Sequence, residues 1–135
     1  DFTATEQKKE TLEHRDYVQE MQVETAKDGY QFTFVIADIA GYEGENSIKQ
    51  TLYHVQAYSL EMAADLYQRE NERQLDFGHM KQIAADMTGQ EIHPLLLELG
   101  HRPGISKSIP VMMEADGAKY ILREMIKAAY GRESL

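Results

Sequence analysis

An Asp-Gly pair between two strand-like segments is the feature that most constrains the fold of this chain. Asp28-Gly29 is typical of two-residue β-hairpin turns, which require a positive φ. The segment 30–39 is rich in aromatic and β-branched residues and contains neither Gly nor Pro, as expected of a strand. Because apolar residues also alternate weakly before the turn, we expect 17–25 and 30–39 to form an antiparallel hairpin. A helix through 6–26 is the competing interpretation.

The stretch 48–73 contains neither Gly nor Pro, and its apolar residues recur at helical spacing. We therefore predict one long central helix over about 47–73, with Asn46 or Ser47 as its N-cap. Its apolar surface is wider than one buried face needs, so we expect part of it to contact a partner chain. The two apolar stripes consist of Ile48, Leu52, Val55, Met62 and Leu66, and of Tyr53, Ala57, Leu60, Ala64 and Tyr67.

Shorter patterned segments follow the predicted long helix. We first expect a helix over 80–87, and then a helix that is introduced by the capping-box spacing of Thr88 and Glu91 and begins near Pro94. An edge strand over 109–113, which contains Pro110, should follow. The last element expected is a helix capped by Asp116. These elements predict an α+β fold, in which an N-terminal antiparallel β-hairpin packs on three to four helices. Residues 1–15 form a polar segment, and 16–135 form a single α+β domain.

Composition and charge exclude several classes of function. The chain has no Cys, which excludes disulfides, thiolate metal sites and cysteine nucleophiles. Its 14 basic and 23 acidic side chains give a formal net charge of −9, which argues against nonspecific nucleic-acid binding and against membrane-surface binding. No apolar run approaches the ~20 residues that span a bilayer. We expect a cytoplasmic protein that does not contact membranes.

The basic residues are concentrated near the C-terminus. Residues 1–100 carry 8 basic and 19 acidic side chains, whereas 101–135 carry 6 and 4. The loop that follows Gly100 combines glycines, cations and hydroxyls, a composition that suits an anion. A solvent-exposed connection explains the same composition more simply, and the phosphate-loop spacing is absent. The residues predicted to bind an anion or ligand here are His101, Arg102, Ser106 and Lys107.

Residues 80–99 match a helix–turn–helix in part, with Gly89 in the turn. The second helix would carry Glu91 and Glu98 but no Lys or Arg, whereas DNA recognition needs hydrogen-bond donors and positive charge. A DNA-associated regulator that uses 80–99 and the basic loop 101–107 is therefore the alternative function, with nucleic acid disfavoured as a partner.

Catalytic and metal-binding motifs are absent from the sequence. The chain has no nucleophile elbow, no dinucleotide fingerprint and no H-E-x-x-H, and the acidic loop 38–46 lacks calcium-loop spacing. A noncanonical enzyme site would require His54, Glu61 and His101 to meet in one pocket. We expect no catalytic residue, no metal and no cofactor, and favour a function without catalysis.

The aromatic and methionine content favours an interaction surface. The chain has 8 Tyr and 7 Met but no Trp, and both residue types suit interfaces. Tyr53, Tyr58, Leu60 and Tyr67 of the long helix are the predicted partner interface. The sequence thus predicts a small acidic binding or regulatory module that acts through protein–protein interaction, with a homodimer as the expected assembly.

Overall fold

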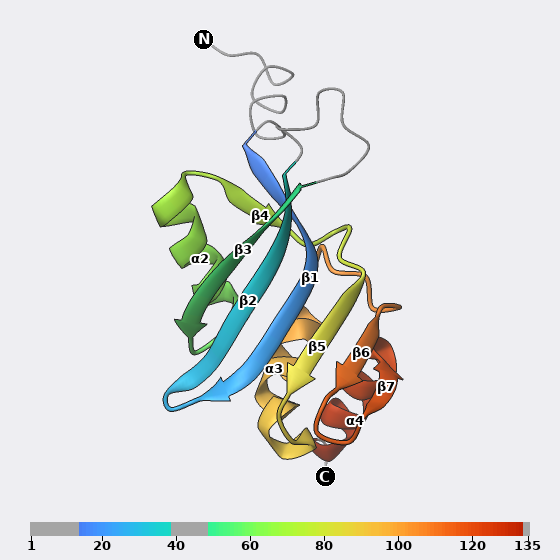
Figure 1. Ribbon diagram of the computed structural model, residues 1–135. Helices are drawn as coiled ribbons and strands as arrows, with labels where there is room; N and C mark the ends of the chain where they lie inside the picture. The colour runs from blue at the N-terminus through green and yellow to red at the C-terminus, as the bar shows by residue number, and fades with distance from the viewer. Residues whose placement is uncertain (1–13, 39–48, 134–135) are drawn as a thin grey trace.

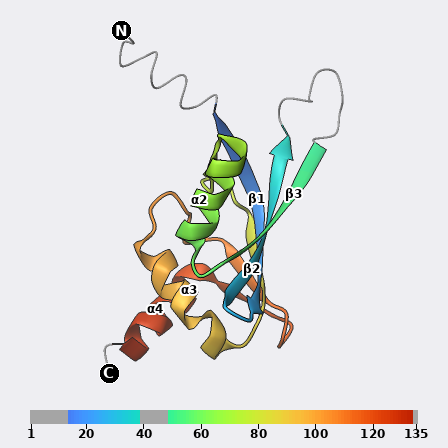
Figure 2. The same cartoon turned by 90° about the vertical axis from the view of Figure 1, so that its left-hand side faces the viewer.

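The computed structural model describes residues 14–38 and 49–133 of this chain. In that part, seven strands form one mixed sheet, and three helices cover one of its faces (Figures 1 and 2). The sheet order is β3-β2-β1-β5-β6-β7, and the short β4 pairs with the start of β1. The elements are β1 (Arg15–Ala26), β2 (Gly29–Asp38), β3 (Lys49–Ala57), α2 (Leu60–Asn71), β4 (Gln74–Asp76), β5 (Gln82–Asp86), α3 (Gly89–His101), β6 (Pro110–Met113), β7 (Ala118–Ile121) and α4 (Leu122–Glu133).

The predicted N-terminal hairpin is confirmed. β1 and β2 pair antiparallel, with one register shift between Val18 and Glu20. At the turn, Gly29 has a φ of 111°, and a Cβ there would lie 2.6 Å from the carbonyl oxygen of Ala57. Both the backbone conformation and this close approach therefore require glycine. The competing helix over 6–26 is wrong, because its described part is strand β1.

The predicted central helix over 47–73 is wrong. The stretch contains strand β3 and the separate helix α2, whose N-cap Ser59 accepts a hydrogen bond from the backbone N–H of Met62. In β3, Val55 and Ala57 are buried while His54 and Gln56 are exposed, which is the period of a strand. The two predicted apolar stripes combine residues of β3 and α2, because one helical period happens to fit apolar residues of both elements. The N-cap candidates Asn46 and Ser47 lie outside the described residues.

The helix predicted over 80–87 is also wrong. This segment contains β5, which runs parallel to both β1 and β6 with Ile83 and Ala85 buried. A short apolar run in a parallel sheet has the same composition as a buried helical turn. The helix–turn–helix interpretation of 80–99 fails with it, because its first helix is a strand.

The capping box that introduces α3 is confirmed. Thr88 is the N-cap, and it exchanges hydrogen bonds with Glu91. The helix begins at Gly89 rather than near Pro94, which lies inside it.

The C-terminal region contains a second hairpin. The strand predicted over 109–113 is confirmed as β6, but it lies between β5 and β7 and not at an edge. Asp116 does not cap a helix; its carboxylate accepts a hydrogen bond from the N–H of Ala118 in the β6–β7 turn. Gly117 has a φ of 69°, as this turn needs. The last helix, α4, begins only at Leu122.

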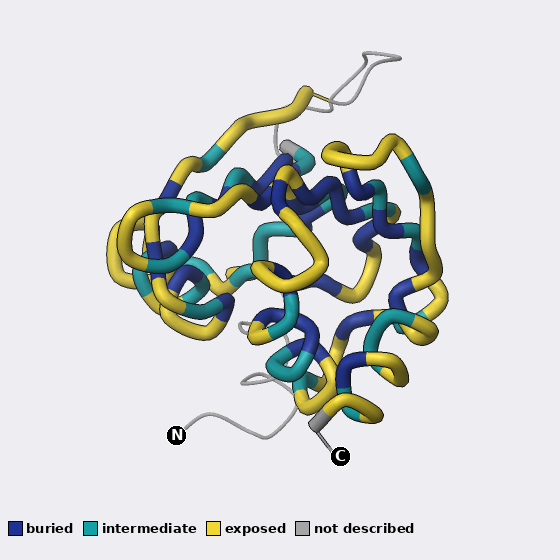
Figure 3. The backbone as a smooth tube through the Cα atoms, turned by 90° about the horizontal axis from the view of Figure 1, so that it is seen from below, coloured by how far each residue is buried: buried dark blue, intermediate teal, exposed yellow. Residues whose placement is uncertain are grey.

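The predicted architecture, a hairpin packed on helices around one long helix, is therefore wrong. Sheet and helices form two layers, seen along the strands in Figure 3, and the core lies between them. The division into 1–15 and 16–135 stays a prediction, and residues 1–13 lie outside the described part. The largest fully buried side chains are Phe32, Phe34, Met21, Leu60, Ile83, Ile92, Leu95, Leu96, Leu99, Leu122, Val18 and Val111.

Candidate interaction surface

The second face of the sheet carries no described helix (Figure 2). Its side chains are mostly polar, because they alternate along each strand with the buried ones. Hydrogen bonds cross the strands on this face: Thr33 Oγ1 lies 2.8 Å from Nδ1 of His54, and Nε2 of Gln82 donates to Glu20 Oε1 over 2.8 Å. This face therefore has the polar character of a sheet surface in contact with water.

A shallow hollow of about 150 Å³ lies on this open face. Its lining includes the carboxylates of Glu24, Asp86 and Glu114 and no basic side chain. No group of three or more His, Asp or Glu side chains in the described part could hold a metal ion. The hollow is therefore acidic without the geometry of a metal centre.

Strand β3 forms one edge of the sheet, and it is unusually open. It has nine residues, contains no Pro, and pairs with β2 without a register shift. Among the described strands, β2 is its only partner. Natural edge strands are usually short, bulged or interrupted by Pro or charge. β3 has one cationic side chain, Lys49, and this lies at its first residue, so its outer backbone groups are exposed to pairing.

The opposite edge, β7, is better protected. It has four residues, carries Lys119, and continues directly into α4, which contacts it. Exposed apolar side chains occur on both edges, and β3 carries Leu52, which is 59% exposed. All of the exposed large apolar residues of the described part lie on an edge strand or where β3 joins α2: Leu52, Tyr58, Met62, Tyr120 and Ile121.

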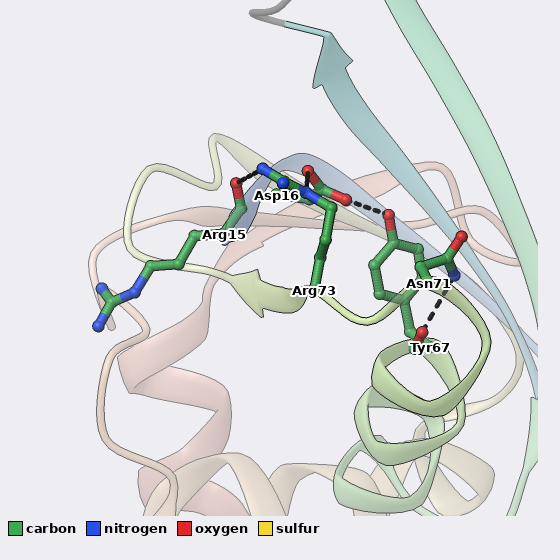
Figure 4. A network of polar contacts seen from close by, with 5 residues as sticks. All are labelled: Arg15, Asp16, Tyr67, Asn71 and Arg73. Carbon is green, nitrogen blue, oxygen red and sulfur yellow. Dashed lines mark hydrogen bonds and ion pairs between the residues drawn. The ribbon is translucent and has the colours of Figure 1, made fainter. Parts of the chain in front are cut away.

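A polar network fixes α2 beneath the sheet (Figure 4). The carboxylate of Asp16 in β1 accepts a hydrogen bond from the hydroxyl of Tyr67. It also forms an ion pair with Arg73, whose Nε lies 2.6 Å from Oδ1 of Asp16. Nη2 of Arg73 also donates to the carbonyl oxygen of Arg15 over 2.9 Å. Burial first, and then the hydrogen bond to Asp16, raise the pKa of Tyr67. The network joins the start of β1 to α2, through Tyr67, and to the residue that precedes β4, Arg73.

Tyr53 connects the edge strand to the same helix. Its ring meets the ring of Tyr67 edge-to-face, with centroids 4.7 Å apart. Its hydroxyl donates to Oε2 of Glu70 over 2.9 Å. Burial, followed by this hydrogen bond, raises the pKa of Tyr53 to about 12. The helix-side face of β3 is thereby fixed to α2, while the strand's outer edge pairs with no described strand.

Glu98 of α3 holds the N-terminus of α2. Its Oε1 accepts a hydrogen bond from the N–H of Leu60 over 2.8 Å, and its Oε2 accepts one from the N–H of Glu61 over 2.9 Å. The first N–H groups of a helix have no partner within the helix, so this carboxylate acts as a cap supplied by another element. This contact accounts for Glu98, an acidic residue that did not suit a DNA-recognition helix.

The predicted partner interface is only partly at the surface. Leu60 and Tyr67 are 0% and 6% exposed and belong to the chain's own core, and Tyr53 is half-buried against Tyr67. Tyr58 is 67% exposed. Leu52, which was predicted to lie in the long helix but outside this interface, belongs to β3, where strand alternation places it on the open face. An interface here stays a prediction.

In the basic loop 101–107, both cations contact the domain itself. The guanidinium carbon of Arg102 lies 5.3 Å from the ring centroid of Phe77. Lys107 Nζ donates to the carbonyl oxygens of Arg102 and Ile105, and burial lowers the pKa of Lys107. These contacts order the loop. Anion binding by its residues stays a prediction.

The remaining predicted residues are dispersed. His101 packs its ring on Tyr130 at the end of α3, and Ser106 Oγ accepts a hydrogen bond from a neighbouring backbone N–H. His54 lies on the open face, whereas Glu61 and His101 lie in the helix layer. The structure therefore does not bring together the three side chains of the noncanonical enzyme hypothesis.

Over residues 14–38 and 49–133, fold and surface together define a two-layer α+β domain with one sheet face that carries no helix and one long edge strand with a single partner. The family model described as "Spore germination protein N-terminal domain" matches residues 8–127, most of the chain, and the chain belongs to this family. No curated protein and no solved structure matches this chain. In the described residues, no helix is long and apolar enough to cross a membrane.

Proposed function

We propose that this chain is a docking domain of a spore germination protein, which acts through contacts with other protein chains and without catalysis. The observation that carries the proposal is the edge strand β3, with its nine residues, its single described partner and its exposed Leu52. The family description, which names a domain of spore germination proteins, supports a place in the germination machinery.

The edge offers a definite mode of contact. A partner strand that adds to β3 would pair with its outward N–H and C=O groups, and each such backbone hydrogen bond contributes about 0.5–1.5 kcal/mol net. Side chains of the partner would lie beside Leu52 and His54 on the open face. Because Tyr53 and Glu70 fix β3 to α2, the strand is held in an extended conformation before a partner arrives.

The test is a charge placed on the edge of the full-length protein in spores of its host. Leu52→Lys puts a cation next to the midpoint of β3, and Ile121→Lys is the matched control on β7, where the side chain is 44% exposed. Both proteins must reach wild-type amounts by immunoblot. We expect the fall in optical density after germinant addition to be slowed at least severalfold by Leu52→Lys and little changed by Ile121→Lys. Equal germination of the two variants and wild type would contradict the proposed function.

A further inference from the structure

Resting on this proposed function, we infer that the strand that pairs with β3 is β3 of a second copy of the same chain. The two strands run antiparallel about a two-fold axis that is perpendicular to the sheet and lies midway between the Tyr53 residues of the two copies. The sheets of both copies then join into one continuous sheet, with the helices of both copies on the same side.

The register follows from the strand itself. Tyr53 is the midpoint of Lys49–Ala57, so only an axis at Tyr53 pairs all nine residues. Residues opposite one another in an antiparallel sheet point to the same face, and this axis meets that condition. It places Leu52 opposite His54 and Gln50 opposite Gln56 on the open face, and Thr51 opposite Val55 on the helix side.

Charge favours this strand for contact between identical chains. The chain has a formal net charge of −9, so most of its surfaces would bring carboxylates together in a homodimer. β3 contains no carboxylate; its only basic residues are Lys49 and His54. In the inferred register Lys49 lies opposite Ala57, so no two like charges face each other across the strands. The opposed Gln50 and Gln56 side chains are amides that can hydrogen-bond to one another.

The helix beside the edge adds surface that contains both apolar and charged side chains. Met62, Leu66 and Glu70 lie four residues apart and therefore form one ridge of α2. Glu70 accepts the hydrogen bond from Tyr53, which places this ridge on the β3 side of the helix. Met62 is 38% exposed. A groove of about 350 Å³ beside it has a mixed apolar and charged lining, made of Ser59, Glu61, Met62, Asp65, Leu66 and Arg69. The two-fold axis would bring the ridges of both copies toward each other.

The size of this surface predicts a weak dimer. A nine-residue strand is about 30 Å long at roughly 3.4 Å per residue. A contact made by one strand edge and the helix beside it is smaller than an interface of standard size, which buries about 800 Å² per copy. Dimerisation should therefore depend on concentration in the micromolar to submillimolar range.

Sedimentation equilibrium of the 135-residue chain tests the dimer. Between about 10 μM and about 1 mM we expect the weight-average mass to rise from 15.5 kDa toward twice that value. Leu52→Lys should remain monomeric, and Ile121→Lys should dimerise like wild type, with both variants showing wild-type circular dichroism. A wild-type chain that stays monomeric throughout would overturn the second copy as occupant. If Leu52→Lys also slows germination, the edge serves another protein and the proposed function stands.

Cysteine pairing tests the register, because the natural chain contains no Cys. Leu52→Cys and His54→Cys are purified separately, mixed at high concentration and oxidised. Directly opposed Cβ atoms lie about 4.5–5.5 Å apart, within reach of a disulfide after small adjustments, whereas diagonal neighbours lie about 7–8 Å apart. We expect the 52–54 heterodimer to exceed, at least fivefold, the product of mixing Leu52→Cys with Gln56→Cys. A larger yield from the second mixture would overturn the axis at Tyr53.

Discussion

Removing the carboxylate of Glu98 should destabilise the domain through the N-terminus of α2. In Glu98→Ala, the N–H of Leu60 loses its acceptor where water cannot replace it, since Leu60 is fully buried. An unpaired buried N–H costs about 1–3 kcal/mol. The N–H of the exposed Glu61 can bind water, so its loss adds little, and the lost helix-dipole interaction adds about 0.3–1 kcal/mol. We expect the free energy of unfolding to fall by about 2–3 kcal/mol.

Urea unfolding followed by circular dichroism measures this loss. For a domain of this size, the expected change corresponds to a decrease in Tm of about 10 °C. Glu98→Gln keeps one side-chain acceptor and should lose only about 1 kcal/mol. Glu124→Ala removes an exposed carboxylate 3.9 Å from Lys127 and should cost less than about 0.5 kcal/mol. If Glu98→Ala is no less stable than Glu124→Ala, the carboxylate does not cap α2 and the reasoning is refuted.

Two further predictions concern the hairpin turn and the buried tyrosines. Gly29→Ala should lower the free energy of unfolding in urea by about 2–4 kcal/mol, because Gly29 has a positive φ and a Cβ there would contact Ala57. Gly117→Ala, whose Cβ would meet open space, should lower it by about 1–2 kcal/mol. Equal losses in the two variants would show that the close approach to Ala57 does not matter. The raised pKa values of Tyr53 and Tyr67 mean that the folded chain holds these protons above pH 10, where the unfolded chain releases them. Stability should therefore be complete below about pH 9 and fall as the pH rises past 10 toward 12, less steeply in Tyr67→Phe; a flat or rising profile would contradict the assignment.

The two Asp-Gly pairs show which parts of the fold the sequence reveals. Asp28-Gly29 predicted the β1–β2 hairpin correctly because the turn chemistry and the strand composition agree. Asp116-Gly117 is the same signal between β6 and β7, but the apolar spacing after it suggested a helix that Asp116 would cap. The four-residue β7 leads directly into α4, so a strand and a helix share one apolar pattern.

The same mixture of periods produced the error at β3. A strand followed at once by a helix, without Gly or Pro between them, resembles one long helix with too many apolar positions. The decisive signals were the β-branched Thr51 and Val55 and the N-cap Ser59. Strand order depends on contacts between distant segments, and no local pattern predicts that β3 forms an edge. That the exposed Leu52, Tyr58 and Met62 lie at this edge was therefore apparent only in the folded chain.

Amide hydrogen exchange along β3, resolved by residue, tests the central claim most directly. An edge strand bonds to its neighbour through alternate residues only, so in the dilute chain one alternate set of amides in 49–57 should exchange slowly and the other set rapidly. At high concentration the rapid set should become protected, while amides of β7 keep their rates. If every amide of β3 is already protected in the dilute monomer, the outer edge is covered within the chain, and the account of β3 as a docking edge is contradicted.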